Sequence, residues 1–125
     1  MTAAYRDLCR ITEAAFQADL ARMRALTAEE AGLRASLADL DRQLRESLAG
    51  AAGEETSWRV LGADEAWRKW LMRRKSEVNM QLARLQVRKA EAIETLKRSF
   101  ARRQVSGEIL GIRLEEARIA ERRRD

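Results

Sequence analysis

The chain of 125 residues contains no proline and no histidine, and it has one cysteine, Cys9. Without proline, nothing in the sequence forces a helix to stop or kink. Without histidine there is no imidazole base or imidazole metal ligand, and one cysteine makes neither an internal disulfide nor a cysteine-rich zinc site. We therefore expect no metal and no cofactor.

Long apolar runs are also absent. No stretch approaches the roughly 18 apolar residues of a membrane span. Residues 1–10 lack the cationic start and the apolar run of a secretory signal. These two absences favour a cytoplasmic protein.

Aromatic residues make up only 5% of the chain, whereas charged residues make up 36%. Alanine, leucine, arginine and glutamate dominate, and all four favour helices. This composition is typical of a coiled coil or a long helix. The sequence shows no glycine-rich phosphate loop and no nucleophile beside a base, so we expect a protein that is not an enzyme.

Charge is divided unevenly between the two halves of the chain. Residues 1–57 carry 7 arginines and 10 acidic residues, and residues 58–125 carry 18 basic and 10 acidic residues. A mildly acidic segment followed by a strongly basic one suits two helices that lie side by side.

Leucine spacing predicts the first helix, over about residues 3–49. Steps of 7, 4, 3 and 4 residues place one row of leucines on one helix face, as in a coiled coil. Upstream, the same face continues less regularly through Tyr5, Leu8, Phe16, Leu20 and Met23. The row consists of Leu26, Leu33, Leu37, Leu40 and Leu44.

Residues 50–63 lose this periodicity and contain three glycines, so they are the predicted connection. Gly50 is placed as the residue past a helix end, and Asp64 as the cap of a second helix over about residues 64–121. The predicted fold is all-α: residues 1–125 form a single antiparallel coiled-coil hairpin of two long helices. Apolar residues face each other when paired residue numbers sum to about 114.

The second helix has its own apolar row, which changes phase at Phe100. Such a stutter unwinds a supercoil locally. The row before the change is Leu71, Val78, Leu82, Leu85, Ala92 and Leu96, and the row after it is Gly107, Leu110, Leu114 and Ala117. We expect Gly107 and Gly111 to leave room for Tyr5 and Leu8, or to form a flexible joint.

All three tryptophans, Trp58, Trp67 and Trp70, lie near the predicted turn. They either cover the open end of a thin two-helix core or face outward as binding anchors, a role in which tryptophan is enriched. Trp67 and Trp70 are neighbours on one helix face, and Leu71 extends that face.

Basic residues recur along the second half, with a surplus at Arg122, Arg123 and Arg124. They form either a solvated face that pairs with the acidic first helix or a contact with an acidic protein. Nucleic acid is the weaker alternative, because glutamates interrupt the basic stretches and the aromatic residues lie elsewhere.

The layout resembles the FliJ family of flagellar type III export and its injectisome relatives of the YscO kind. The stretch from Ser57 through Leu110 carries the resemblance: SWRVLGADEAWRKWLMRRKSEVNMQLARLQVRKAEAIETLKRSFARRQVSGEIL. Members are short cytoplasmic hairpins of two long helices, with aromatic residues at the start of the second helix.

The resemblance implies a non-catalytic stalk, similar to the central γ subunit of rotary ATPases and peripheral at the inner-membrane export machinery. The end with both termini would enter the hexameric export ATPase, with Tyr5, Arg6, Arg102, Arg103, Arg122, Arg123 and Arg124 as the candidate contacts. The body and turn would contact the export gate and export chaperones, with Trp67, Trp70, Leu71 and Arg74 as the candidates for the gate.

Two other functions stay open. One is a coiled-coil scaffold that dimerises into a four-helix bundle, because a two-helix pair buries little area for its length. The other is a basic helical nucleic-acid binder. We expect a monomer or a weak dimer with no membrane span.

Overall fold

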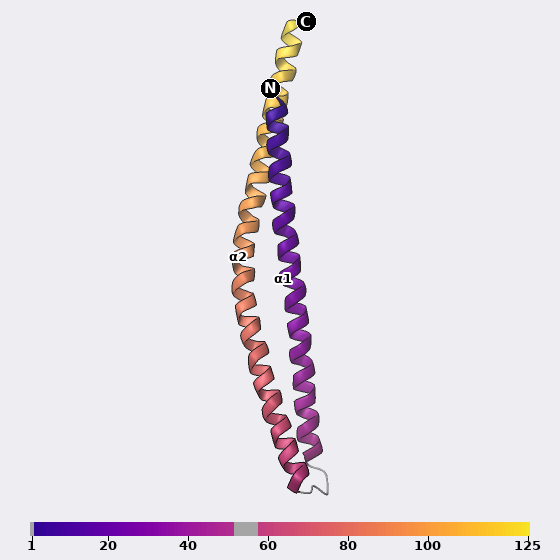
Figure 1. Ribbon diagram of the computed structural model, residues 1–125. Coiled ribbons are helices and arrows are strands. Elements are labelled where there is room, and N and C mark those ends of the chain that lie inside the picture. The colour runs from indigo at the N-terminus through magenta and orange to yellow at the C-terminus, as the bar shows by residue number, and fades with distance from the viewer. Residues whose placement is uncertain (1, 52–57) are drawn as a thin grey trace. The chain divides into compact units, whose positions relative to one another are not determined.

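The protein is an all-α hairpin of two helices, α1 (Thr2–Ala51) and α2 (Trp58–Arg124) (Figure 1). The computed structural model describes residues 2–51 and 58–125, of which residues 51 and 58–61 are described by their backbone alone. No strand occurs in these two ranges. The predicted fold class is therefore confirmed.

The helices are longer than the leucine pattern predicts. α1 continues through Gly50 to Ala51, and α2 already begins at Trp58. The expected cap, Asp64, lies inside α2, where its carbonyl oxygen accepts a hydrogen bond from Arg68 Nε at 3.3 Å. A helical glycine costs only about 1 kcal/mol relative to alanine, and without proline that cost does not end a helix. The placement of Gly50 as a residue past the helix end and of Asp64 as a cap was therefore wrong.

The chain forms two compact units. Unit 1 consists of Met1–Ala25 and Lys89–Asp125, and unit 2 consists of Leu26–Arg88. Each unit pairs a segment of α1 with a segment of α2, so each has its own seam between the helices.

Unit 2 has an apolar seam. Leu71, Val78 and Leu40 form its buried cluster, and Leu33, Leu37 and Leu44 pack against that cluster. At the edge of the seam, Lys75 Nζ lies 2.7 Å from Asp41 Oδ1, and Arg88 donates to Glu29 at 3.0 Å. These pairs sum to 116 and 117, which places the register within a few residues of the predicted 114.

The seam of unit 1 contains both polar and apolar residues. Ser99 and Ser106 are its buried polar residues. The Ser99 hydroxyl donates to the Asp19 carboxylate, and Cys9 Sγ donates to the carbonyl oxygen of Ser106 at 3.2 Å. In the described part of the chain, every buried side-chain nitrogen and oxygen has a hydrogen-bond partner. The seam of unit 1 is therefore closed by hydrogen bonds in addition to apolar contact.

One buried row of α2 keeps a strict seven-residue spacing and does not change phase at Phe100, which is 49% exposed. Leu82 is also buried, between two members of this row. The predicted stutter was wrong because the next two seam positions are serines, which an apolar pattern passes over. Gly107 does not enter the seam either, since it is exposed. The row is Leu71, Val78, Leu85, Ala92, Ser99 and Ser106.

The covered row of α1 is equally regular over residues 5–44. Its steps alternate between four and three residues, as a coiled-coil seam requires. Cys9 occupies the place that the sequence pattern assigned to Leu8, whereas Leu8 is exposed. This row consists of Tyr5, Cys9, Thr12, Phe16, Asp19, Met23, Leu26, Glu30, Leu33, Leu37, Leu40 and Leu44.

Candidate protein-binding surfaces

Unit 2 presents a pair of stacked tryptophans on α2. The ring centroids of Trp67 and Trp70 lie 5.1 Å apart with an interplanar angle of 8°. Their exposed fractions are 46% and 47%, so each ring keeps a large apolar area in contact with water. The structure thus favours the outward-facing interpretation for these two residues, whereas the side chain of Trp58 lies outside the described residues.

Two arginines border this stack. Trp70, Arg73, Arg74 and Glu77 line a shallow hollow of about 250 Å³. Arg74 Nη1 lies 3.1 Å from Glu77 Oε2 in an exposed pair, an arrangement that typically contributes little to stability. We call Trp67, Trp70, Arg73 and Arg74 the tryptophan surface.

Leu71 does not belong to this surface. It is 1% exposed and sits in the core cluster of unit 2 with Leu40 and Val78. Its expected role as a partner contact on the same face as Trp67 and Trp70 is corrected, because a one-residue step from Trp70 turns the side chain into the seam.

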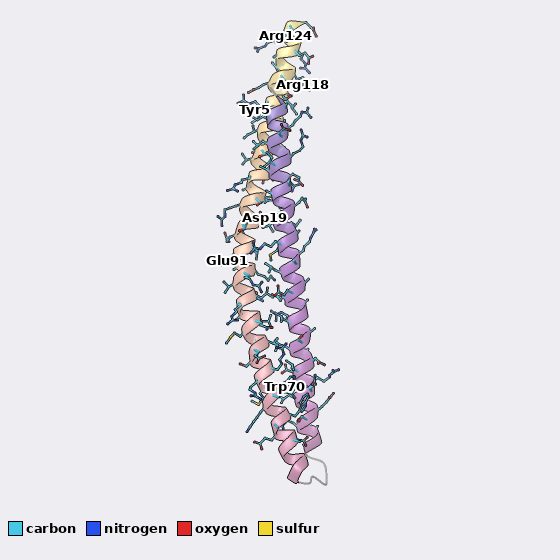
Figure 2. The ribbon with its side chains drawn as sticks, viewed as in Figure 1. Tyr5, Asp19, Trp70, Glu91, Arg118 and Arg124 are labelled. Carbon is cyan, nitrogen blue, oxygen red and sulfur yellow. The ribbon has the colours of Figure 1, made fainter. Side chains whose placement is uncertain are left out.

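The last turn of α2, which belongs to unit 1, is basic. Arg122, Arg123 and Arg124 occupy this turn, where positive charge interacts favourably with the helix dipole. All three are exposed and make no ion pair with a described residue. Figure 2 shows Arg118 and Arg124 along this part of α2, with Tyr5 near the start of α1.

Tyr5 is half-buried against α2. The guanidinium carbon of Arg113 lies 5.3 Å from the centroid of the Tyr5 ring, a cation–π contact. The hydrogen bond from Arg113 to Glu116 is the largest cause that raises the pKa of Arg113 above its ordinary value. Arg6, next in the chain, is exposed. Tyr5 therefore contributes to the packing of unit 1, and Arg6 is free to contact a partner.

Arg102 and Arg103 have different surroundings. Arg103 pairs with Glu13, and its guanidinium carbon lies 4.7 Å from the centroid of the Phe16 ring. Arg102 is exposed. Of these two predicted partner contacts, Arg103 is engaged in the seam of its own unit and Arg102 is available.

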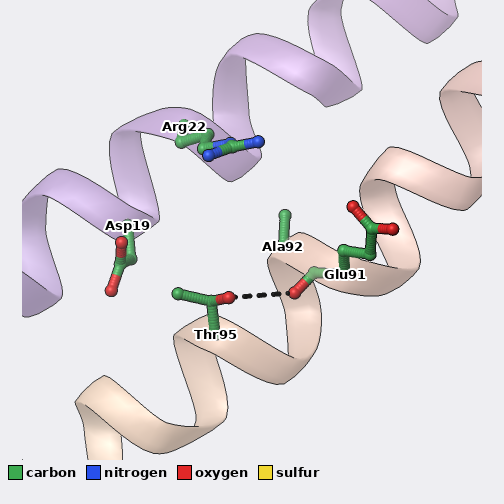
Figure 3. Close-up of a pocket in the computed structure, with 5 residues that line it drawn as sticks. All are labelled: Asp19, Arg22, Glu91, Ala92 and Thr95. Carbon is green, nitrogen blue, oxygen red and sulfur yellow. Dashed lines mark hydrogen bonds between the residues drawn. The ribbon is translucent and has the colours of Figure 1, made fainter.

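A polar hollow of about 160 Å³ opens on one side of unit 1 (Figure 3). Asp19 and Arg22 come from α1, and Glu91, Ala92 and Thr95 come from α2. The hydroxyl of Thr95 donates to the carbonyl oxygen of Glu91 at 3.1 Å, so it serves the helix itself. No group of three or more possible metal ligands occurs within residues 2–51 and 58–125.

Sequence reasoning missed the polar seam and the exposure of Phe100. The sequence did contain an indication of both features, namely the seven-residue spacing that continues from Leu71 to Ser106. A search for apolar residues alone gives Phe100 priority over Ser99, although the serine occupies the seam.

Comparisons with protein families, with characterised proteins and with solved structures gave no match to this chain. Neither described helix has a stretch apolar and long enough to cross a bilayer. The functional argument therefore depends on the surfaces of the two units.

Proposed function

We propose that the protein is a non-catalytic coiled-coil stalk or adaptor of a flagellar-type (type III) protein export apparatus. In this role it bridges the hexameric export ATPase and the export gate or its chaperones. The observation that carries the proposal is the exposed stack of Trp67 and Trp70, because large aromatic side chains held on a surface are typical of binding hot spots.

The second support is the chemical difference between the two units. Unit 2 offers aromatic rings bordered by arginine, whereas unit 1 offers a run of arginines without aromatic residues beside it. Surfaces of different chemistry suit different partners, since charge complementarity governs the choice of partner more than its affinity. An adaptor between two proteins needs two such surfaces.

Site-specific photo-crosslinking in the native cell tests this proposal. A crosslinker at Trp70 should capture a gate or chaperone component, and one at Arg123 should capture the export ATPase. A crosslinker at Gln81, an exposed position outside both surfaces, is the control. If neither position captures an export component above the Gln81 control, the export function is rejected.

Exposed apolar residues on α2 favour a second candidate, a scaffold that dimerises into a four-helix bundle. Met72, Met80 and Val87 in unit 2 are all more than half exposed. Light scattering at increasing concentration distinguishes the dimeric scaffold from the adaptor. A four-helix bundle has twice the mass of the chain, whereas a single adaptor has the mass of one chain.

A further inference from the structure

Unit 1 buries only small side chains among its described residues. They are Ala92, Ser99 and Ser106, all on α2. On the other side of the seam, none of residues 2–25 of α1 is buried. The stabilisation from burial grows with the apolar area removed from water, and these three side chains contain little such area. Full burial therefore contributes little to closing the seam of unit 1.

The aromatic contact across this seam is partly open to water. Phe16 of α1 and Phe100 of α2 have ring centroids 6.0 Å apart and an interplanar angle of 57°. Phe100 is 49% exposed, and Phe16 is half-buried. The contact removes only part of each ring from water, so it stabilises the seam less than a fully buried aromatic pair does.

The hydrogen bonds across the seam of unit 1 can be replaced by hydrogen bonds to water. Ser99 donates to the Asp19 carboxylate, and Cys9 Sγ donates to the carbonyl oxygen of Ser106 at 3.2 Å. When the two helices separate, water binds each of these groups. The net stabilisation from each bond is therefore small compared with the strength of the bond itself.

Unit 2, in contrast, is closed by large apolar side chains. Leu71 and Val78 are each 1% exposed, and Leu85 is 0% exposed. Separating the helices of unit 2 would transfer these side chains to water, which is strongly unfavourable. The two units therefore differ in the free energy needed to open them.

The net charges of the paired segments also differ between the units. In unit 2, residues 26–50 carry three basic and five acidic side chains, and residues 62–88 carry seven basic and three acidic ones. In unit 1, residues 2–25 carry four basic and three acidic side chains, and residues 89–125 carry ten basic and seven acidic ones. The paired segments therefore attract each other in unit 2, whereas both are positive in unit 1 and repel each other.

The ion pair between Arg103 and Glu13 opposes this repulsion in unit 1. Both side chains are 43% exposed, and such pairs contribute little to stability. Dissolved salt screens the repulsion between distant charges strongly, whereas it screens a partly buried pair in direct contact much less. Added salt should therefore favour the closed form of unit 1.

We propose that unit 1 opens and closes while unit 2 stays paired, and that salt favours the closed form. In the open form, residues 2–25 of α1 separate from α2 and fray, because a helix without a partner is marginally stable in water. Opening changes the surface that unit 1 presents and leaves the tryptophan surface of unit 2 as it is. The inference goes beyond the export function proposed above and does not depend on it.

Thiol labelling of buried positions in the full chain tests this proposal. Every variant carries Cys9→Ser, so that only one thiol is present at a time. Ser106→Cys places the thiol in unit 1 and Val78→Cys places it in unit 2, at positions that are 5% and 1% exposed. Iodoacetamide, which is uncharged, reacts with a buried thiol when the seam opens. Dividing each labelling rate by the rate in the urea-unfolded chain gives the open fraction at that position.

We expect the open fraction at position 106 to be at least about tenfold larger than that at position 78. Raising the NaCl concentration from about 20 mM to about 300 mM should lower the open fraction at position 106 by about twofold or more. The same change should not lower the open fraction at position 78, because salt weakens the attraction between the segments of unit 2.

Two alanine variants show whether the opening is confined to unit 1. Phe16→Ala removes the contact with Phe100. It should raise the open fraction at position 106 by about tenfold and change that at position 78 by less than about twofold. Ile11→Ala, at a 66% exposed position of the same α1 segment, is the matched control and should change neither fraction. Circular dichroism checks that each variant stays helical.

Three results would overturn the proposal. One is the same open fraction at positions 106 and 78, since the hairpin would then open only as a whole. Another is a Phe16→Ala variant in which both open fractions rise by the same factor. The third is an open fraction at position 106 that rises when salt is added.

Discussion

Ser99 and Asp19, from different helices, form a hydrogen bond inside the seam of unit 1. Ser99 is buried, and in α2 it occupies the place that leucine or valine fills in unit 2. A hydrogen bond from a neutral donor to a carboxylate is costly to break at such a position, because loss of one group leaves the other without its partner.

The first prediction concerns this pair. Asp19→Leu alone should lower the free energy of unfolding by about 1 kcal/mol, because it leaves the Ser99 hydroxyl without its acceptor. The Asp19→Leu/Ser99→Leu double variant should instead be more stable than wild type, because an apolar pair replaces a polar one at the same positions. Urea unfolding followed by circular dichroism measures both. A double variant less stable than the single variant would contradict this account of the seam.

The second prediction compares two apolar residues of unit 2. Leu85→Ala should lower the free energy of unfolding by about 2–4 kcal/mol, because Leu85 is fully buried and its removal leaves a cavity. Val87→Ala, two residues on and exposed, should change it by less than about 0.5 kcal/mol. Thermal unfolding compares the two. Equal effects would mean that the assigned seam is incorrect.

The third prediction concerns Gly111, which the sequence pattern assigned, with Gly107, to the packing of Tyr5 and Leu8. A Cβ atom there would meet nothing within 4 Å, so that packing role was wrong. Gly111→Ala should therefore raise the free energy of unfolding by up to about 1 kcal/mol through helix propensity alone. A lower melting temperature for this variant would show that the glycine makes a close contact after all.

The fourth prediction compares the two units. Amides of the unit 1 seam, over residues 9–25 and 89–106, should exchange with deuterium faster than those of unit 2, over residues 26–48 and 71–88. The reason is that the buried apolar contacts that protect amides are concentrated in unit 2. Hydrogen exchange with mass spectrometry of peptides from each range measures the difference. Equal protection of the amides in the two units would contradict this prediction.

The fifth prediction concerns nucleic acid. Many basic residues lie beside a glutamate on the same helix, such as Arg113 with Glu116 and Arg118 with Glu115, both at three-residue spacing. Few positive charges are then left to displace counterions, so binding to a duplex should be weak and its salt dependence shallow. A titration with duplex DNA at two salt concentrations measures this. A steep salt dependence with submicromolar affinity would instead support the nucleic-acid-binding function.

The sequence predicted the helices, their pairing and the apolar seam of unit 2, because there leucine spacing and burial coincide. It misplaced the seam of unit 1, where Ser99 and Ser106 are buried and Phe100 is exposed. Burial of a small hydroxyl depends on a partner from the other helix, and no local pattern contains that partner. The same limit applies to Leu71 and Trp70, since adjacent residues that look alike in sequence have opposite exposures.

The change from leucine to serine along an unbroken seven-residue spacing has a consequence for alignment. A coiled coil of repeated leucines tolerates a slide of one heptad, because leucine then meets leucine again. Glu13, however, would meet Leu96 or Leu110 in place of Arg103 after such a slide. Because each helix runs through both units, that mismatch penalises the whole displaced arrangement. The polar residues in the seam of unit 1 thus determine which of several nearly equivalent pairings of the two helices the chain adopts.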